Sequence, residues 1–391
     1  MVVHPRGTES AVSWPDARAR ALAAGAPTAP RELPLDACAG AVLAAPLRAL
    51  APLPPFDTCA MDGWAVAGAG PWRVVGELLA GRAWPEPLAE GTALGIATGA
   101  PVPAGATAVL PVENAFFAGD LVNGPVEPGR HVRRAGEECA TGDALLPEGW
   151  VITAAVLGLA AAAGHDRLAV HPRPSVVALV TGDELLDHGL PRDGLVRDAL
   201  GPQLARLVSA AGGELLGRQH VADDADLLAK ALAGAAADLV VTTGASSAGP
   251  ADHLRGVLAD LGAQVLVDGV ACRPGHPQLL ALLPDGRLVV GLPGNPLAAL
   301  VAAVTVLAPA LAGLGGRELP PPRAALLTTA IRAAEHDTRL VPVRLRGLTA
   351  EPTRHAGSGM LRGAALADAL AVVPPGPSLE ADAEVEVLPL P

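Results

Sequence analysis

Between residues 175 and 314, short apolar runs alternate with amphipathic stretches along the chain. The amphipathic stretches at 198–212, 224–234 and 252–261 have the spacing of helices. The apolar runs have the length and β-branched content of buried strands, and they read SVVALVT, ELLGRQ, DLVVTT, AQVLVDGV and RLVVGL. Such alternation is typical of a parallel sheet that carries helices on both faces, so we predict a three-layer α/β domain here.

The segments on either side of 175–314 have a different pattern of apolar and polar residues. Residues 11–25 predict a short amphipathic helix, and 31–49 predict a brief strand followed by a helix over LDACAGAVLAAPLRAL. Between residues 56 and 130, β-like runs such as WRVVGELL and GTALGIAT are separated by Gly and Pro, which is typical of a small all-β unit. An Ala-rich helix is expected after Val151, and the runs RLVPVRLRGL and AEVEVLPL predict a β-rich C-terminal domain.

A chain of 391 residues exceeds what one hydrophobic core usually holds, so several domains are expected. Segments rich in proline and glycine lie where the pattern of apolar and polar residues changes, notably Pro172-Arg173-Pro174 and 313–322. Length alone is compatible with two to four domains.

Composition narrows the functional classes. Half of the residues are hydrophobic, 17% are charged, and the formal net charge is −12, which argues against a protein that binds the phosphate backbone of nucleic acids. Aromatic side chains, on which bases would stack, make up 2% of the chain. Positive charge at an anion site must come mainly from arginine, because Lys230 is the only lysine.

The chain has the features of a soluble, cytoplasmic protein. Its first ten residues, MVVHPRGTES, lack the basic and then apolar layout of a signal peptide. The stretch 296–314 is long enough to cross a bilayer, but it is Ala-rich, contains Pro309 and starts from a loop, so we predict a buried core helix and no membrane span. The four cysteines form no CxxC pair, which indicates reduced packing residues rather than a zinc site or a disulfide framework.

The stretch 238–252, DLVVTTGASSAGPAD, is the first candidate for chemistry. A predicted buried strand stops at Gly244, a loop of small residues containing Ser247 and Gly249 follows, and Asp252 precedes a predicted helix. Backbone N–H groups and the positive end of that helix would face one spot, which suits an anion such as phosphate. The alternative is an ordinary strand-to-helix turn, since such turns are often rich in Gly and Ser.

Two other predicted strand ends carry polar loops. TGDE, which ends in Asp183-Glu184, follows SVVALV, and GLPGNP follows RLVV. The carboxyl ends of parallel strands share one edge of a sheet, so the three loops are expected to form one crevice. Carboxylates at Asp183, Glu184 and Asp252 suit Mg²⁺, which takes oxygen ligands and often bridges phosphates. As the alternative, the same acids serve as N-caps or first-turn acids of helices.

The loop CRPGHP lies between these strand ends in the sequence. Its Arg273 and His276 have the chemistry to hold an oxyanion, arginine through its forked guanidinium and histidine as a single donor or when protonated. A plain surface turn is the alternative for this loop. An Asp-Gly turn is likewise the alternative for Asp62-Gly63, and a plain loop is the alternative for TGAPVP, which begins at Thr98.

Seven motifs occur together in the order and approximate spacing of one known family. They are PPFDTCAMDGWAV, IATGAPVPAGATAVLPVEN, RRAGEECATGDALL, VVALVTGDELL, VVTTGASSAGPAD, RPGHP and GLPGNP. In these motifs the chain resembles the MoeA family of molybdopterin molybdenumtransferases, and it is similar to the E domain of gephyrin. The resemblance covers nearly the whole chain.

The resemblance implies an elongated four-domain subunit. Its expected parts are an N-terminal helix and small α/β linking domain formed by 1–50 plus 131–171, a β-rich insertion domain at 51–130 that carries AMDG, a central α/β domain of the molybdopterin-binding type at 172–314, and a C-terminal β-barrel-like domain at 315–391. It implies a homodimer in which the β-rich region bearing AMDG lies near the active site of the other subunit. The implied reaction inserts molybdate into adenylylated molybdopterin with Mg²⁺, releases AMP and yields molybdenum cofactor. Expected partners are molybdopterin adenylyltransferase and the apoproteins or chaperones of molybdoenzymes, with no nucleic acid and no membrane.

The resemblance also implies site residues, position by position. The functional acidic and hydroxyl positions of the family correspond to Asp62, Thr98, Glu184, Asp223 and Asp252, with Glu184 and Asp252 as the expected Mg²⁺ ligands. Together with the loops above, the expected substrate-binding residues are Thr98, Gly244, Ser247, Gly249, Arg273, His276, Pro293, Pro296, Arg339 and Ser358, the last within AGSGM.

Several positions depart from the family pattern. Arg273 and His276 stand where the family usually has two lysines, and a histidine carries positive charge only when protonated. Ala298 replaces a serine after GLPGNP, and Leu200 replaces an asparagine. Because such changes lie where molybdate or pterin would be held, the alternative function is a non-catalytic paralogue that binds, stores or delivers molybdopterin or the finished cofactor. A scaffold that only oligomerises has no dedicated support in the sequence.

Overall fold

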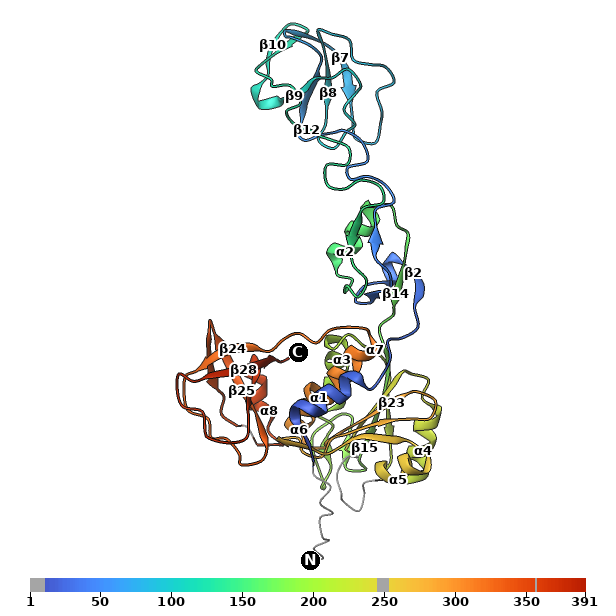
Figure 1. The fold of residues 1–391 in the computed structure, drawn as a ribbon, viewed down its shortest axis with the longest axis vertical. Coiled ribbons are helices and arrows are strands. Elements are labelled where there is room, and N and C mark those ends of the chain that lie inside the picture. The colour runs from blue at the N-terminus through green and yellow to red at the C-terminus, as the bar shows by residue number, and fades with distance from the viewer. Residues whose placement is uncertain (1–10, 245–252, 356) are drawn as a thin grey trace, which may run out of the picture. The chain divides into compact units, whose positions relative to one another are not determined.

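The computed structural model describes residues 11–244, 253–355 and 357–391 (Figure 1). The chain divides into two compact units. The first comprises Met1–Arg31, Gly40–Val42 and Val170–Pro391, and the second comprises Glu32–Ala39 and Leu43–Ala169. The central α/β region and the C-terminal region therefore share one unit.

A six-stranded sheet forms the centre of the first unit. Its order is β18 (Glu214–Val221), β15 (Ser175–Thr181), β19 (Leu239–Thr243), β23 (Leu288–Leu292), β22 (Leu279–Leu282) and β20 (Gln264–Asp268). The first four strands are parallel, as expected, whereas β22 is antiparallel to β23 and β20 is antiparallel to β22. The expectation of an entirely parallel sheet is wrong at this end, because a short hairpin connects β22 to β23 and only antiparallel strands can share one.

Helices cover both faces of this sheet and bury alternate side chains of the same strands (Figure 1). Leu239 and Val241 of β19 pack on one face with α1, α3, α6 and α7, whereas Val240 packs on the other face with α4 and α5. The helices are α1 (Trp14–Ala23), α3 (Gly201–Ala210), α4 (Ala225–Gly234), α5 (Leu254–Asp260), α6 (Pro296–Ala302) and α7 (Ala308–Leu314). The predicted three-layer α/β architecture is confirmed.

The apolar stretch 296–314 is a buried core helix, as predicted. One turn of π-helix, η3 (Ala303–Leu307), joins α6 to α7. Within the described part of the chain it is the one helix whose length and composition would allow it to cross a membrane, and 78% of its apolar window is buried. It packs against α1, where Nε1 of Trp14 donates a hydrogen bond to Oγ1 of Thr305 at 3.0 Å.

A seven-stranded sheet joins three distant parts of the chain. β1 (Val12–Ser13) pairs in parallel with β21 (Val270–Arg273), and β21 pairs in parallel with β25 (Thr338–Arg346). The C-terminal region supplies β26 (Thr349–Pro352), β24 (Arg323–Leu327), β28 (Glu384–Pro389) and β27 (Ala369–Val373), and its one helix among the described residues is α8 (Leu361–Ala365). The run AQVLVDGV, expected to be one strand, is instead split at Gly269 (φ +76°), with β20 and β21 in different sheets.

The second unit is largely β, as predicted. Its six-stranded sheet has the order β10 (Phe116–Ala118), β11 (Leu121–Asn123), β7 (Trp72–Leu78), β8 (Thr92–Ile96), β6 (Gly63–Val66) and β9 (Ala108–Pro111). Two shorter pairs are β5 (Thr58–Cys59) with β12 (Val132–Arg133) and β4 (Leu47–Arg48) with β13 (Ala144–Leu146). A 3₁₀ turn, η2 (Val112–Asn114), follows β9, and the Ala-rich helix expected after Val151 is α2 (Ala154–Ala162).

The helix expected over LDACAGAVLAAPLRAL is wrong. That segment holds one 3₁₀ turn, η1 (Leu35–Ala37), and the short strands β3 (Val42–Leu43) and β4. β3 forms a three-stranded sheet with β14 (Arg167–His171) and β2 (Arg31–Pro34). Gly40, at φ +76°, and Pro46 interrupt the helical spacing, so pairing with distant strands prevails over the helix propensity of the alanines.

Candidate functional site

Three parallel strands of the central sheet end beside one another. Val180 of β15 lies opposite Thr243 of β19 in the register, and Thr243 lies opposite Leu292 of β23. The segments that follow these strand ends line one cleft of about 770 Å³. The predicted site residues that line it are Glu184, Asp223, Gly244, Pro293 and Pro296.

The loop that follows β15 contains two acids, Asp183 and Glu184, and only one of them lines the cleft. Gly182 has φ +136°, and a Cβ there would lie 2.6 Å from Oε2 of Glu184, so glycine lets this carboxylate fold back over the strand end. Oδ2 of Asp223 accepts a hydrogen bond from the Asp183 N–H at 3.3 Å, and Oδ1 of Asp183 accepts one from the Asp223 N–H at 3.2 Å. Glu184 and Asp223 line the cleft, whereas Asp183 does not.

Asp198 is a buried carboxylate of the cleft that sequence reasoning did not select. Its side chain is 4% exposed and accepts hydrogen bonds from the N–H groups of Leu200 and Gly201, each at 2.8 Å. It also forms an ion pair with Arg218 at 3.1 Å. The sequence did hold a signal for Asp198, because an acid at the start of a predicted helix is a typical capping residue.

A short parallel strand pair forms the outer wall of the cleft. β16 (Leu185–Leu186) pairs with β17 (Val196–Arg197), and Leu185, Val196 and Arg197 all line the cleft. Arg197 is exposed and is the one basic side chain among the described residues of the lining. Sequence reasoning missed it because nothing in the local pattern distinguishes it from other surface arginines.

The GLPGNP loop contacts the segment that carries Ser358. It leads from β23 into α6, which begins at Pro296. The carbonyl oxygen of Ser358 accepts hydrogen bonds from the N–H groups of Leu297 at 2.9 Å and Ala298 at 3.1 Å. Gly359 lines the cleft, so the AGSGM segment reaches its edge, and the side chain of Ser358 is exposed.

Two arginines predicted to bind substrate, Arg273 and Arg339, lie beside each other on adjacent strands. Arg273 of β21 is the register partner of Arg339 of β25. Nε of Arg273 donates a hydrogen bond to Oδ2 of Asp337 at 2.5 Å, and Arg339 donates one to the carbonyl oxygen of Arg332. Neither arginine lines the cleft; the loop after Arg273 reaches it through Pro277.

A buried glutamine holds this loop in place. Nε2 of Gln278 donates hydrogen bonds to the Gly275 carbonyl at 2.7 Å and to Sγ of Cys272 at 3.3 Å. The carbonyl of His276 accepts a hydrogen bond from the Val270 N–H at 3.0 Å, and the His276 side chain is exposed and does not line the cleft. Burial raises the pKa of the Cys272 thiol to about 12, so it stays protonated near neutral pH. All four cysteines are free and buried, as predicted.

Asp62 and Thr98 meet in the second unit, at the start of β6. Oδ1 of Asp62 accepts hydrogen bonds from the Thr98 N–H at 2.7 Å and from the Thr98 hydroxyl at 3.0 Å. These hydrogen bonds, the backbone one foremost, hold the pKa of Asp62 below its usual value. Gly63 begins a strand, and a Cβ there would lie 2.0 Å from the Leu110 carbonyl oxygen, so this glycine permits the close approach of β6 and β9.

No group of three or more His, Cys, Asp or Glu side chains within the described residues is placed to hold a metal ion. The predicted residues Ser247, Gly249 and Asp252 lie outside the described residues. A Mg²⁺ site that combines one or two carboxylates with substrate phosphates requires fewer protein ligands than such a group. Glu184 and Asp223 are the two carboxylates of the cleft that remain open to this role.

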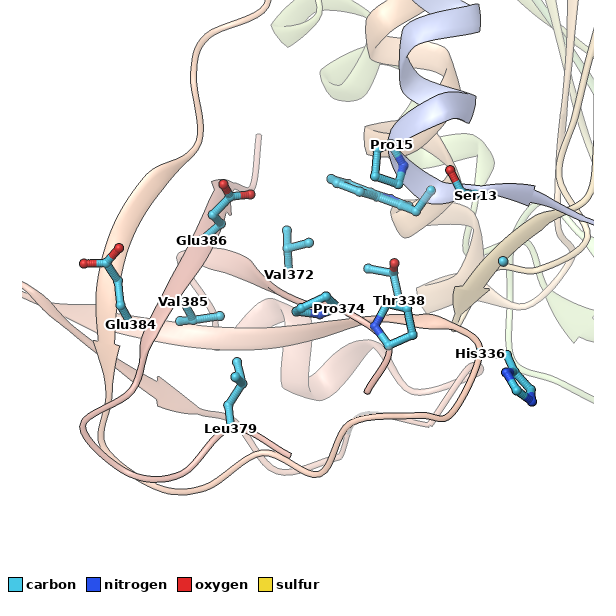
Figure 2. A pocket seen from close by; sticks show the side chains of 13 residues that line it. Ser13, Pro15, His336, Thr338, Val372, Pro374, Leu379, Glu384, Val385 and Glu386 are labelled. Atoms are coloured by element: carbon cyan, nitrogen blue, oxygen red, sulfur yellow. The ribbon is translucent and has the colours of Figure 1, made fainter. Parts of the chain in front are cut away.

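A second cavity, of about 560 Å³, lies elsewhere in the first unit (Figure 2). It opens between the start of α1, at Pro15, and the C-terminal sheet, where Val372 and Pro374 line it. Glu384 and Glu386 of β28 add two carboxylates to this mainly apolar lining. None of the predicted site residues lines it, so it is distinct from the cleft at the edge of the central sheet.

Family models match the chain in three consecutive segments. Residues 12–164 match the MoeA N-terminal region (domain I and II), and residues 177–313 match the probable molybdopterin binding domain. Residues 324–390 match the MoeA C-terminal region (domain IV). The three matches follow one another in the order implied by the sequence motifs.

Individual relatives are similar over most of their length. Molybdopterin molybdenumtransferase 2 of Mycobacterium tuberculosis is 37% identical over 326 residues, which cover 77% of this chain and 80% of the relative. The molybdopterin molybdenumtransferase of Synechococcus elongatus is 36% identical over 305 residues, covering 73% and 75%. The crystal structure of the molybdopterin biosynthesis MoeA protein of Pyrococcus horikoshii is similar with a TM-score of 0.76 at 26% identity, covering 98% of this chain and 100% of that one.

Proposed function

The chain belongs to the MoeA family of molybdopterin molybdenumtransferases, and from this premise we propose that it inserts molybdate into adenylylated molybdopterin with Mg²⁺ and releases AMP. Its place in molybdenum cofactor biosynthesis follows from the family. The observation that carries the finer proposal is the cleft at the carboxyl edge of the central sheet. Its volume, about 770 Å³, is in the usual range of sites for ligands of this size.

Glu184 and Asp223 are the described residues that would hold Mg²⁺. Carboxylate oxygens suit this ion, which commonly binds one or two of them together with substrate phosphates and water. Asp198 is a weaker ligand, because Leu200, Gly201 and Arg218 already occupy its oxygens. Bound Mg²⁺ would neutralise phosphate charge and stabilise the charge that develops as AMP leaves. Asp252 keeps the role that the family resemblance implies for it.

Arg197 is positioned to bind the phosphoryl end of the substrate. Its guanidinium lines the cleft and is exposed, and it forms no ion pair within the part of the chain that the structure describes. A guanidinium donates two parallel hydrogen bonds to phosphoryl oxygens, which fixes both their position and their orientation. In this proposal Arg197 would hold the phosphates, and Glu184 and Asp223 would hold the cation.

Arg273, His276, Arg339 and Ser358 would hold molybdate at the edge of the same cleft. The support is the pairing of Arg273 with Arg339 on adjacent strands and the approach of Pro277 and Gly359 to the cleft. The dithiolene sulfurs that receive molybdenum belong to the substrate, so the reaction needs no cysteine nucleophile. The buried, protonated thiol of Cys272 beside this loop is consistent with that division of roles.

We further propose a cytoplasmic homodimer in which Asp62 and Thr98 act at the cleft of the other subunit. The support is the AMDG motif and the lowered pKa of Asp62, which leaves a carboxylate ionised near neutral pH. Molybdopterin adenylyltransferase would supply the substrate. Apoproteins or chaperones of molybdoenzymes would receive the product.

A reconstituted assay tests this function. Purified protein is mixed anaerobically with adenylylated molybdopterin, molybdate and Mg²⁺, and AMP and active cofactor are measured. We expect AMP release and cofactor formation that depend on molybdate and on Mg²⁺. Pterin binding without molybdate-dependent turnover would instead identify a protein that stores or delivers the cofactor, and failure to bind the pterin would exclude both functions.

A further inference from the structure

The hydroxyl of Thr243 lies unused at the floor of the cleft. Thr243 ends β19, the strand between β15 and β23, and it is 1% exposed while lining the cleft. Its Oγ1 has no hydrogen-bond partner among the described residues. Buried polar groups in folded proteins are nearly always hydrogen-bonded, and an unpaired one lowers the stability of the fold.

The other polar side chains of the described lining are a second hydroxyl, carboxylates, the amide of Asn295 and the guanidinium of Arg197. Thr181 is the other hydroxyl residue among the described lining residues, and its Oγ1 donates a hydrogen bond to the Thr243 carbonyl at 2.8 Å. The ionised carboxylates of Glu184 and Asp223 only accept hydrogen bonds. Thr243 therefore carries the one side-chain hydroxyl among the described lining residues that has no hydrogen-bond partner.

Two glycines line the cleft beside Thr243 and let the neighbouring strand ends approach each other closely. Gly244 has φ +87°, and a Cβ there would lie 2.7 Å from the Thr181 carbonyl oxygen. A Cβ on Gly294 would lie 3.5 Å from Cα of Gly244. Because neither residue has a side chain, the ends of β19 and β23 meet the cleft as bare backbone beside Thr243.

We propose that Thr243 is a substrate-binding residue whose hydroxyl donates a hydrogen bond to a phosphoryl oxygen of adenylylated molybdopterin. This inference rests on the proposed function and adds a contact that the motifs do not assign. Phosphoryl oxygens only accept hydrogen bonds, so in a cleft with several carboxylates each must meet a donor or a cation. Thr243 supplies a donor at the floor, and Arg197 supplies one at the outer wall.

Thr242 provides a matched control one residue away. It is 0% exposed, and its Oγ1 likewise has no partner among the described residues. Successive side chains of a strand point to opposite faces, and Thr242 does not line the cleft. Valine keeps the β-branched shape of threonine, so Thr242→Val and Thr243→Val both remove an unpaired buried hydroxyl. Both variants are expected to fold, with thermal midpoints equal to or above that of the wild type.

The affinity for adenylylated molybdopterin is expected to differ between Thr243→Val and Thr242→Val. Thr243→Val is expected to bind adenylylated molybdopterin about tenfold more weakly in anaerobic titration calorimetry, the effect of losing one hydrogen bond to a charged acceptor. Thr242→Val should stay within about twofold of the wild type, and Thr243→Ser, which restores the hydroxyl, should recover most of the affinity. Unchanged binding by Thr243→Val, or an equal loss in Thr242→Val, would overturn the inference.

Inhibition by AMP tests whether Thr243 contacts the phosphoryl group of the adenylate or the pterin part of the substrate. If Thr243 binds a phosphoryl oxygen of the adenylate, inhibition by AMP should weaken in Thr243→Val by a factor similar to the loss for the full substrate. Unchanged inhibition by AMP would overturn the assignment to that phosphoryl group. If the wild type itself fails to bind the adenylylated pterin, the proposed function fails and this inference fails with it. If the wild type binds and Thr243→Val binds equally well, the inference alone fails.

Discussion

Arg273 donates a hydrogen bond through Nε to Oδ2 of Asp337 at 2.5 Å, which ties the loop of the predicted oxyanion residues to the start of β25. The arginine side chain is 73% exposed and that of the aspartate is 18% exposed. Exposed ion pairs typically contribute about 1 kcal/mol or less to stability. The main effect of the pair is therefore to offset part of the positive charge that the loop presents to an oxyanion.

Asp337→Asn is expected to lower the KM for molybdate about two- to fivefold, because the neighbouring charge that competes for Arg273 is removed. Initial rates of AMP release against molybdate concentration measure this change. Asp285→Asn is the control, since it removes the partner of Arg287 at 2.7 Å in the hairpin between β22 and β23 and should leave that KM unchanged. A higher KM in Asp337→Asn would mean that the ion pair chiefly aims Arg273.

Glu184→Gln is expected to reduce Mg²⁺-dependent AMP release by about ten- to a hundredfold, because it removes a charged oxygen ligand and keeps the size of the side chain. The free energy of unfolding should change by about 0.5 kcal/mol or less. Urea denaturation and AMP assays measure the two effects, and Asp252→Ala should behave in the same way.

Asp198→Asn is the structural counterpart of that variant. Its buried carboxylate serves two N–H groups and Arg218, so the substitution should lower the free energy of unfolding by about 1–3 kcal/mol. If Glu184→Gln lost stability to a similar extent, Glu184 would have a capping role instead of a catalytic one.

Asp62→Asn is expected to lower turnover at least about tenfold while leaving the thermal midpoint nearly unchanged, since the removed charge is at an exposed functional position. The lowered pKa of Asp62 sets the pH dependence: its stabilising contacts are present near neutral pH and are lost as the pH falls through the folded pKa. The pH–rate profile of the wild type should therefore show no titration of Asp62 between about pH 5 and 9.

Asp57→Asn is the control for Asp62 in the same unit. Asp57 also has a lowered pKa, through hydrogen bonds from the Ala135 N–H at 2.8 Å and from Arg134 at 2.5 Å. These contacts join distant segments of the second unit, so the variant should lose stability and keep its turnover. Full activity in Asp62→Asn would remove Asp62 from the reaction.

Gly63→Ala is expected to destabilise the second unit by about 1–3 kcal/mol, because its Cβ would lie 2.0 Å from the Leu110 carbonyl oxygen and force β6 away from β9. Urea denaturation measures the loss. Gly158→Ala is the control in α2, where a Cβ meets nothing within 4 Å, and alanine should raise stability there by about 0.5–1 kcal/mol. A neutral Gly63→Ala would show that the two strands separate at little cost.

The sequence indicates the layers of the central domain but not every strand direction. Hydrophobic periodicity marks a buried strand and is the same for parallel and antiparallel neighbours, so the reversal at β22 was missed. A signal was present, because Asp285-Gly286 between two apolar runs is a typical hairpin turn, and Gly286 has φ +89°. In 31–49, alanine composition favoured a helix, although Gly40 and Pro46 were local signals against one. The strands there pair with distant segments, and no local pattern identifies those partners.

The lining of the cleft was predictable for residues that directly follow a strand end. Glu184, Gly244 and Pro296 line the cleft for that reason. The adjacency of Arg273 and Arg339 depends on pairing between β21 and β25, which are far apart in the chain. Thr243 was overlooked because a threonine that ends an apolar run resembles any other β-branched strand residue, and its unpaired hydroxyl is visible only in three dimensions.

The seven-stranded sheet sets an order of assembly during synthesis. β21 emerges from the ribosome with one edge ready for β1 and the other unfilled until β25 has been made. A chain that stops after α7 would carry β21 with an open edge, which is a template for pairing with other chains. The loop CRPGHP, which we propose to bind molybdate, overlaps the end of β21, and its Arg273 pairs with Arg339 of β25. A chain that lacks β25 would therefore also lack the strand pairing that holds Arg273 beside Arg339.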